Sequence, residues 1–433
     1  MFMPGFPPKG GARPGYTGKL RQNYAPGQGH AGKEGAMTGA DDRELRIAYL
    51  SDFDPSDPTL YSGGNAAMLA ALRAEGNAVT VLGQSWGLAE PLRRAVLATP
   101  EALSIRARWR LHLALARVIA RRVRAELAQG RFDVLFCAYS FHSLSRLSRP
   151  YPMVTAYSSD ATPTIYRAST VGQSFGSWFA PSRLLDPAIE RAEARVFRGL
   201  DLALWPSDWL TDAVNARYGL DPARSRTLPW GANIADPGVA APAPALGTGH
   251  PVEILLVGRD WQAKGGPVTA ETVALLRARG LDARLTVIGC TPPPEIDRAG
   301  LSVHPHLRKS DPTELAVFQD AFRRAHFLLM PSYESYGFAF CEASAYGLPS
   351  LCLDAGGVPV WTGKNGHALP VGSTAADFAA VIQRYIGDPA AHAALCKSAR
   401  RVYEDKLNWT AWGRAATEAM RLAVIDRCRA EPR

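Results

Sequence analysis

Two stretches of the chain share one order of apolar and polar positions. Each opens with an apolar run, RIAYL from residue 46 and EILLVG from residue 253. A polar loop ending in Gly-Gly follows, then a helical stretch closing on LRAEG or LRARG, then a second apolar run, VTVLG or LTVIG. Runs this apolar favour buried parallel strands, and the glycine favours a helix end. The pattern predicts a strand–helix–strand unit at the start of each half.

Further apolar runs follow each unit and alternate with helical stretches. The first half adds FDVLFCAY, MVTAYSS and LALWPS, and the second adds LSVHPHL, HFLLMPS and SLCLDA. Alternating strands and helices are typical of doubly wound sheets. The predicted fold class is α/β, with two doubly wound Rossmann-like domains and an interdomain cleft as the ligand site.

The same patterns divide the chain into four segments. Residues 1–42 are rich in glycine and proline and poor in aliphatic side chains, which predicts a disordered basic tail. Residues 43–235 and 252–433 are the predicted N-terminal and C-terminal domains, and residues 236–251 are the predicted linker. The last helix is a candidate to cross back to the N-terminal domain.

The net charge of +9 raises the question of an anionic partner. Five cations and no acidic residue lie within residues 1–33, so over half of the excess belongs to the tail. Aromatic residues do not interleave with the cations, so no nucleic-acid partner is expected. One helical stretch carries arginines on a single stripe: Arg106, Arg110, Arg117, Arg121 and Arg124. The stripe favours a solvated helix face, with docking on an anionic membrane surface as the alternative.

The other compositional signals exclude several classes of protein. No apolar run approaches the ~18 residues of a membrane-spanning helix, and early prolines interrupt any signal-peptide core. The six cysteines show no metal-ligand spacing. His304 and His306 lie two apart on a predicted strand, but no third ligand accompanies them. We expect a cytoplasmic protein, with peripheral attachment to the inner face of the membrane as an option, and neither a metal nor a cofactor.

Two loops of the second half carry candidate chemistry. In VGRDWQAKGG, Arg259 and Lys264 follow the end of a predicted strand, where a guanidinium and an ammonium suit a diphosphate. A solvated loop is the alternative. In PSYESYGFAFCEASAYGLP, Glu334 precedes a predicted helix that begins near Gly337, and Glu342 lies inside it. The amides at the helix start favour an anion, and carboxylates accept hydrogen bonds from paired hydroxyls. This pattern suits a sugar nucleotide. The alternatives are a charge at the helix N-terminus for Glu334 and a surface position for Glu342.

Together these motifs resemble the family 4 retaining glycosyltransferases of GT-B fold. The resemblance rests on the Glu-x7-Glu motif in ESYGFAFCE, GR-x4-KG, DAGGVP, GKNGHALPVG and, more weakly, the earlier SGGN and LPWGANI. It implies that Arg259 and Lys264 hold the donor diphosphate, that Glu342 holds the ribose and that Glu334 contacts the transferred sugar. The other donor-binding residues that it implies are Gly63, Gly64, Ser335, Tyr336, Gly337 and Phe338.

The chain departs from the family pattern at three positions. Val360 follows GGVP where the family often has Glu, and Asn233 ends WGAN where Asp is common. In AYSSDATP, Ser159 stands where many members have His, before Asp160. Asp160 is kept as a catalytic candidate on the acceptor side, and an N-cap or turn role is its alternative.

The resemblance implies a retaining hexosyltransferase-type enzyme. It would move a sugar from a nucleotide-diphosphate sugar to a hydroxyl of a glycan, lipid or other acceptor, in polysaccharide or glycolipid synthesis. The alternative is a catalytically idle sugar-nucleotide-binding protein that recruits partners.

Overall fold

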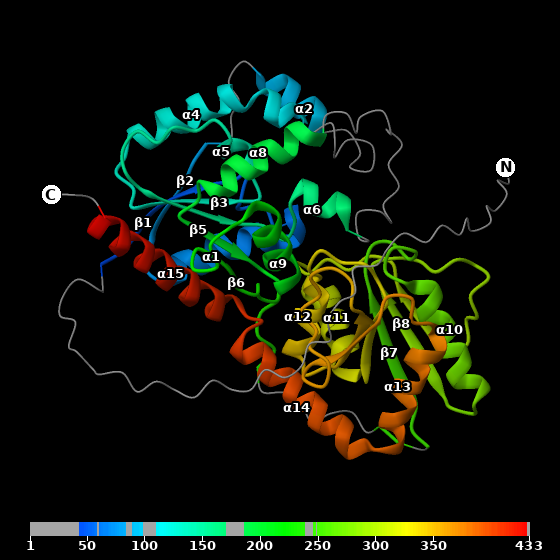
Figure 1. Ribbon diagram of the computed structural model, residues 1–433. Coiled ribbons are helices and arrows are strands. Elements are labelled where there is room, and N and C mark those ends of the chain that lie inside the picture. Colours follow the sequence, from blue (N-terminus) through cyan, green and yellow to red (C-terminus); the bar gives the residue numbers. More distant parts are fainter. Residues whose placement is uncertain are drawn as a thin grey trace, which may run out of the picture. The chain divides into compact units, whose positions relative to one another are not determined.

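The computed structural model describes residues 43–58, 60–83, 89–97, 110–169, 186–238, 246–247 and 249–430. Every described helix and strand belongs to the compact unit Glu44–Arg433 (Figure 1). The predicted tail, Arg106 of the arginine stripe and residues 239–245 of the predicted linker lie outside the described residues.

The first half forms a six-stranded parallel sheet in the order β2-β1-β3-β4-β5-β6. Its strands are β1 (Arg46–Leu50), β2 (Ala78–Val81), β3 (Val134–Ala138), β4 (Val154–Ser158), β5 (Leu202–Trp205) and β6 (Ser225–Thr227). The order reverses between β1 and β3, so this is the switch point at which such sheets bind ligands.

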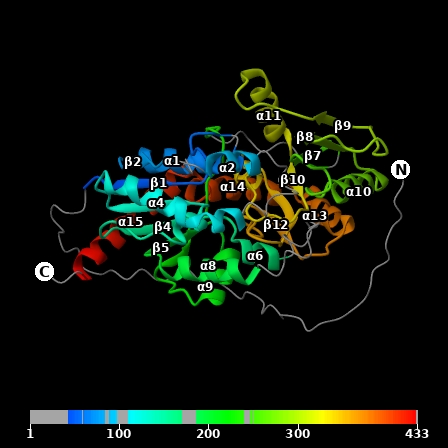
Figure 2. The ribbon, with the colours of Figure 1, turned by 90° about the horizontal axis from the view of Figure 1, so that it is seen from above.

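Helices cover both faces of this sheet because its strands are apolar at consecutive positions. Ile47 and Tyr49 pack with α1 (Gly64–Ala74), whereas Ala48 and Leu50 pack with α4 (Ala116–Ala128) and α8 (Asp186–Arg198). Figure 1 shows α1 on the face opposite to α4 and α8. Other described helices of this half are η1 (Leu60–Gly63), α2 (Glu90–Leu97), α5 (Phe141–Leu144), α6 (Pro163–Ala168) and α9 (Asp208–Tyr218), and residues 110–114 are also helical. Of these, α9 lies beside α8 and β5 (Figure 2).

The second half repeats the plan with the sheet order β12-β11-β10-β7-β8-β9. Its strands are β7 (Val252–Val257), β8 (Ala283–Ile288), β9 (Leu301–His304), β10 (Phe327–Met330), β11 (Ser350–Leu353) and β12 (Gly366–Leu369). Its helices are α10 (Gly266–Ala278), α11 (Pro312–Arg324), α12 (Phe338–Ala345), α13 (Ala375–Gly387) and α14 (Pro389–Asp405). Each apolar run quoted above contains a strand, so the predicted α/β class with two doubly wound sheets is confirmed.

The last described helix, α15 (Trp409–Ala430), packs against α1, β4 and β5 of the first half. Trp412 and Met420 are fully buried in the same cluster as Tyr49 and Leu72. A Cβ on Gly413 would stand 2.9 Å from the carbonyl oxygen of Ala71, so α15 and α1 approach to backbone contact. Helix α15 therefore completes the core that β1 and α1 begin.

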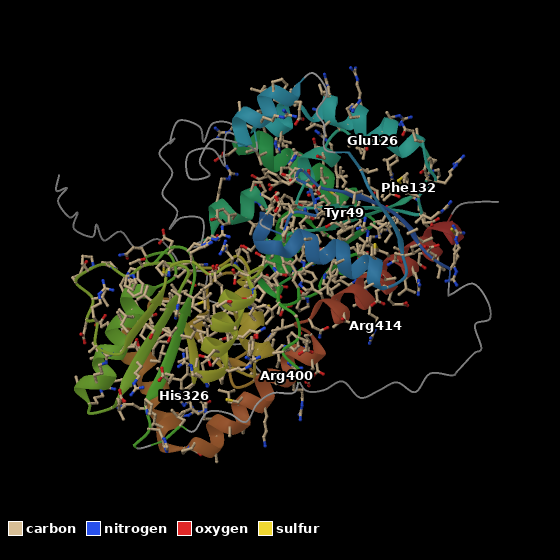
Figure 3. The ribbon with its side chains drawn as sticks, turned by 180° about the vertical axis from the view of Figure 1, so that it is seen from behind. Tyr49, Glu126, Phe132, His326, Arg400 and Arg414 are labelled. Atoms are coloured by element: carbon tan, nitrogen blue, oxygen red, sulfur yellow. The ribbon has the colours of Figure 1, made fainter. Side chains whose placement is uncertain are left out.

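Side-chain hydrogen bonds tie these elements together. The Tyr49 hydroxyl donates to Asn65 Oδ1 at 2.6 Å, linking β1 to α1. Arg400 of α14 donates to Asp236 Oδ1 at 2.9 Å and to the carbonyl oxygen of Ala345 at 2.6 Å (Figure 3). Among the described helices, none has both the length and the apolar character needed to cross a membrane.

Candidate functional site

Lys264 and Glu334, predicted separately from two motifs, form an ion pair. Lys264 Nζ lies 2.5 Å from Glu334 Oε1, which also accepts a hydrogen bond from Ser332 Oγ at 2.8 Å. Glycine makes this approach possible, because a Cβ on Gly258 would stand 2.3 Å from Lys264 Cγ. The lysine therefore lies across the end of β7 to reach the loop that follows β10.

The backbone of the same loop packs directly on the chain leaving β10. Gly265 caps α10 with φ +74°, and a Cβ at this position would stand 2.5 Å from the carbonyl oxygen of Pro331. Both the positive φ and the close approach require glycine. The GR-x4-KG motif thus brings Lys264 to residues 334–337, the ESYG loop, because the backbone of Gly265 contacts the backbone of Pro331.

Arg259, the other predicted diphosphate ligand, is exposed one residue past Gly258. Its guanidinium forms no ion pair with any carboxylate in the part of the chain that the structure describes. Arg259 is therefore a cation that no described carboxylate neutralises.

Glu342 is buried in α12 with 4% of its surface exposed. Lys309 Nζ, from the loop after β9, lies 2.5 Å from Glu342 Oε1 and 4.6 Å from the centre of the Phe318 ring. Burial raises the pKa of Glu342, and the neighbouring ammonium opposes that rise. Sequence reasoning missed Lys309 and Ser332, because no spacing connects a lysine in one loop to a glutamate on a distant helix.

The start of α12 is built as predicted, with Gly337 as its N-cap at φ +92° and a stop before Gly347. Tyr336 and Phe338, whose backbone amides are the predicted donor contacts, pack their side chains against Trp230. The Tyr336 hydroxyl donates to the carbonyl oxygen of Trp230 at 2.7 Å, and the Phe338 ring stacks on Trp230 with centroids 5.8 Å apart. The predicted amide contacts at the helix start do not involve these side chains.

The Gly63–Gly64 loop lies against the same helix. A Cβ on Gly64 would stand 2.7 Å from Phe338 Cζ and 2.9 Å from the Tyr139 hydroxyl, and Gly63 has φ +85°. Asn233, one of the three departures, donates from Nδ2 to the carbonyl oxygen of Ser62 at 2.6 Å and accepts at Oδ1 from Trp409 Nε1 at 2.8 Å. An aspartate could not donate to Ser62, so asparagine suits this position.

Asp160 lies next to the ESYG loop rather than in a cap. Ser335 Oγ donates to Asp160 Oδ2 at 2.7 Å, while the N-cap of α6 is Thr162. The N-cap alternative for Asp160 is therefore wrong. Burial raises the pKa of Asp160, the Ser335 hydrogen bond lowers it and nearby Glu334 raises it further. Ser335 thus connects the acceptor-side candidate to the donor-side loop.

The remaining sequence candidates have simpler surroundings. Val360 is buried in the second core, so its side chain replaces a charged group with an apolar contact. Ser159 is buried and donates to the carbonyl oxygen of Ala161 at 2.8 Å. Within the described residues, His304 and His306 belong to no group of three metal-ligating side chains.

Family models match both halves of the chain. The model described as "Glycosyltransferase Family 4" matches residues 65–236, and that described as "Glycosyl transferases group 1" matches residues 251–388. The chain belongs to the family 4 glycosyltransferases. The first match covers β2 to β6 of the first sheet. The second covers the whole second sheet, including the glycosyltransferase motifs at Arg259, Lys264, Glu334 and Glu342.

Curated relatives are 27% identical to this glycosyltransferase over the aligned residues. The D-inositol 3-phosphate glycosyltransferase of Rhodococcus jostii (strain RHA1) is 27% identical over 282 residues, which is 61% of this chain and 62% of the relative. That of Streptomyces bingchenggensis (strain BCW-1) is 27% identical over 249 residues, covering 52% of this chain and 54% of the relative. The chain thus spans roughly three fifths of the length of the first relative.

Solved structures establish the GT-B fold of the glycosyltransferase. Sucrose-phosphate synthase from Thermosynechococcus elongatus superposes with a TM-score of 0.61 at 18% identity, covering 89% of this chain and 100% of that one. The apo form of the lipopolysaccharide outer core galactosyltransferase WaaB gives 0.58 at 13% identity, covering 87% and 99%. Anabaena HepE, solved in complex with UDP, gives 0.55 at 14% identity, also covering 87% and 99%.

Proposed function

We propose that the protein is a retaining enzyme that transfers a sugar from a nucleotide-diphosphate sugar to a hydroxyl acceptor. One observation carries the proposal: Lys264 pairs with Glu334 at 2.5 Å, and the next residue, Ser335, binds Asp160 at 2.7 Å. The residues proposed to bind the diphosphate, the sugar and the acceptor are thus linked by two side-chain contacts and one peptide bond. Such a cluster suits transfer between two substrates held side by side.

The donor would lie along the second half, from Glu342 to Glu334. Lys309 occupies Oε1 of Glu342, and Oε2 accepts no hydrogen bond from the described residues, which leaves it for ribose hydroxyls. Arg259, Lys264 and the amides at the start of α12 would bind the diphosphate. Glu334 would accept hydrogen bonds from the transferred sugar, next to the Gly63–Gly64 loop. Neither a metal nor a cofactor enters this scheme.

In the proposed reaction the bond between the sugar and the diphosphate breaks first. Charge develops on the departing diphosphate, and Arg259, Lys264 and the helix amides stabilise it. The acceptor hydroxyl then attacks from the same face and retains the anomeric configuration. Asp160, held by Ser335, would contact sugar or acceptor hydroxyls. The idle-binder alternative is not favoured, because Asp160, Lys264 and Glu334 lie together.

The acceptor class is a glycan, lipid or other polyol in polysaccharide or glycolipid synthesis. The curated relatives act on D-inositol 3-phosphate, as their names state, so phosphorylated polyols belong in the first acceptor screen. Arg117, Arg121 and Arg124 of α4 are exposed, which supports either a solvated face or docking on an anionic membrane surface. Co-sedimentation with anionic vesicles distinguishes these two roles of the stripe.

The proposed domains are residues 43–235 and 252–433, joined by residues 236–251 and preceded by a basic tail. Two features support this division, the separate sheets and the core of each half. Limited proteolysis should cut first within the tail and the linker. Early cleavage inside either sheet would contradict these boundaries.

The deciding experiment is a donor screen followed by product analysis. UDP, GDP and ADP sugars are first compared by their effect on the melting temperature, since a bound ligand raises apparent stability by mass action. The donor that stabilises the protein is then incubated with polyol and glycan acceptors, and proton NMR reads the anomeric configuration of the product. A product of inverted configuration would overturn the retaining mechanism. Donor binding without transfer or hydrolysis would favour the idle binder.

A further inference from the structure

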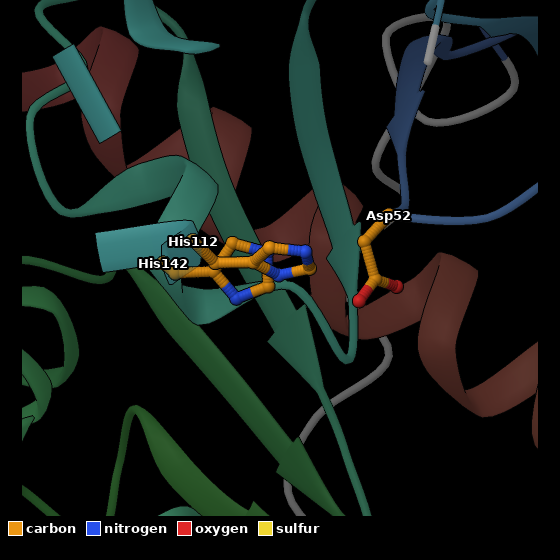
Figure 4. Close-up of side chains that lie close together, drawn as sticks. All are labelled: Asp52, His112 and His142. Atoms are coloured by element: carbon orange, nitrogen blue, oxygen red, sulfur yellow. The ribbon is translucent and has the colours of Figure 1, made fainter. Parts of the chain in front are cut away.

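Three potential metal ligands gather in the first half, and none of them belongs to a motif discussed so far. Asp52, His112 and His142 place one ligand atom each within 4.8 Å of the others. Figure 4 shows the two imidazole rings next to one another, tilted by 47°, with the Asp52 carboxylate beside them. The ring centroids are 4.1 Å apart, and both histidines are almost completely buried, at 1% and 2% exposure.

The fold brings these residues together from three separate segments. Asp52 is the second residue past β1, and His142 lies in α5 directly after β3. These two strands are neighbours at the switch point of the sheet, where their carboxyl ends meet. His112 comes from the helical residues 110–114 that precede α4. No sequence spacing could have revealed this group.

The chemistry of the group matches a borderline divalent cation. Two imidazoles and one carboxylate are a common ligand set for Zn²⁺, whereas Mg²⁺ and Ca²⁺ prefer oxygen ligands alone. With bonds of about 2.1 Å, tetrahedral ligand atoms lie about 3.5 Å apart. Side-chain rotation can close the separation observed here, because each ligand atom needs to move by only about 1 Å.

The outer contacts of the group also resemble those of a metal site. Tyr61 donates from its hydroxyl to Asp52 Oδ1 at 2.8 Å, and Ser140 Oγ lies 3.1 Å from His142 Nε2. The other ring nitrogen of His142, Nδ1, is buried and has no hydrogen-bond partner among the described residues. A buried polar atom in this state is costly unless a water or an ion satisfies it. Hydrogen bonds from outer residues orient metal ligands in the same way.

We propose that Asp52, His112 and His142 bind one Zn²⁺-like divalent cation, with a fourth coordination position open to water or another ligand. The cation would join the loop after β1 to α5 and to the segment before α4. Tyr61 stacks on Tyr139 with ring centroids 3.9 Å apart, so the effect would extend to the neighbouring Gly63–Gly64 loop. None of the three proposed ligands is a proposed donor-binding or catalytic residue, so Zn²⁺ binding can be tested without a transfer assay.

Calorimetry on the full-length, tag-free and metal-stripped protein tests the site with Zn²⁺ alone. We expect one ion per chain and a melting temperature that rises with Zn²⁺. Asp52→Asn and His142→Gln should each weaken Zn²⁺ binding at least tenfold. The matched control is His304→Gln with His306→Gln, which removes the pair at the end of β9 and should leave binding unchanged. Binding of Co²⁺ should give the visible absorption of a four-coordinate ion.

Two results would overturn the site. One is a wild-type protein that binds Zn²⁺ no more tightly than the Asp52→Asn variant, which would make the group a buried polar cluster. The other is loss of binding in the His304/His306 control, which would move the ion to that pair. Asp52→Asn changes no volume, so it decides the question even where His142→Gln fails to fold. A circular dichroism spectrum of each metal-free variant identifies such a failure.

Discussion

Arg259 and Lys264 differ in how many contacts their substitution would disturb. It is exposed, and it has no carboxylate partner within the described chain, so removing it disturbs no ion pair there. Lys264 is different, because its replacement would leave Glu334 without its partner at 2.5 Å. Arg259 is therefore the cleaner probe of the proposed diphosphate site.

Changing Arg259 to Ala should lower turnover by about one to three orders of magnitude, the range for losing a charge that stabilises a transition state. The melting temperature should stay constant. Steady-state kinetics with the identified donor measure the effect, and Arg324→Ala, an exposed arginine on α11, is the control. Unchanged turnover in Arg259→Ala would remove this residue from the leaving-group site.

The two glutamates should divide the donor between them. Glu342→Gln should weaken binding of the bare nucleoside diphosphate by about 1.5 kcal/mol, since a neutral amide replaces a charged acceptor. Glu334→Gln should keep that affinity and lose about two orders of magnitude of transfer, because its partner is the sugar. Calorimetry with the diphosphate and a transfer assay read both roles. Equal losses of diphosphate affinity would show that this division is wrong.

Lys309 should stabilise the protein by keeping a buried carboxylate paired. Lys309→Met leaves ionised Glu342 buried and should cost about 1–3 kcal/mol of unfolding free energy near pH 8, less than for a fully buried pair because Lys309 is partly exposed. Burial already raises the pKa of Glu342, and losing the ammonium raises it further. The folded state then binds the proton more tightly than the unfolded state, so the cost falls as the pH drops through the folded pKa.

Denaturant unfolding of Lys309→Met at pH 8 and pH 5 checks this sign. The control is the double variant Lys309→Met with Glu342→Gln, which removes both charges and should recover most of the stability. A cost that grows toward pH 5, or a double variant as weak as the single one, would rule out the pairing argument.

At the scale of elements, glycines set the distances between loops that carry the site. Gly258, Gly265 and Gly64 each stand where a Cβ would come within 2.7 Å of another part of the chain. Gly357 does the same for the DAGGVP loop, where a Cβ would stand 2.2 Å from the carbonyl oxygen of Ser335. Loop motifs of the family thus encode close backbone approach as well as ligand chemistry.

Gly64→Ala should push the first loop away from Phe338. We expect a loss of about 1–3 kcal/mol in stability, the range for overpacking, together with weaker donor binding. Gly387→Ala, at the end of α13 with nothing within 4 Å of its new Cβ, should stay within about 0.5 kcal/mol of the wild type. Thermal unfolding compares the two. Equal stability of both variants would show that the Gly63–Gly64 loop can move away from Phe338 without lowering the unfolding free energy.

At the scale of the whole molecule, helix α15 completes the core of the first half. Trp412 on α15 is fully buried and lies against Phe136 of β3, with ring centroids 6.1 Å apart. Trp412→Ala should therefore destabilise the protein by about 3–5 kcal/mol. Leu422→Ala on the same helix is the control, because 47% of Leu422 is exposed. Chemical denaturation measures the unfolding free energy of both variants. A small loss for Trp412→Ala would show that α15 does not contribute to the core of the first half.

Local patterns were enough to predict the α/β class and every described strand except β6 and β12. Runs such as FDVLFCAY report burial on both sheet faces, and a glycine at a helix end reports positive φ, so neighbours along the chain contain this information. The pairing of Lys309 with Glu342, of Asp160 with Ser335, and the gathering of Asp52, His112 and His142 depend on tertiary structure alone. Each joins segments brought together by the sheet order, and side-chain contact across such distances has no period in the sequence. The packing of the Tyr336 and Phe338 side chains on Trp230, from the other half of the chain, depends on tertiary structure for the same reason.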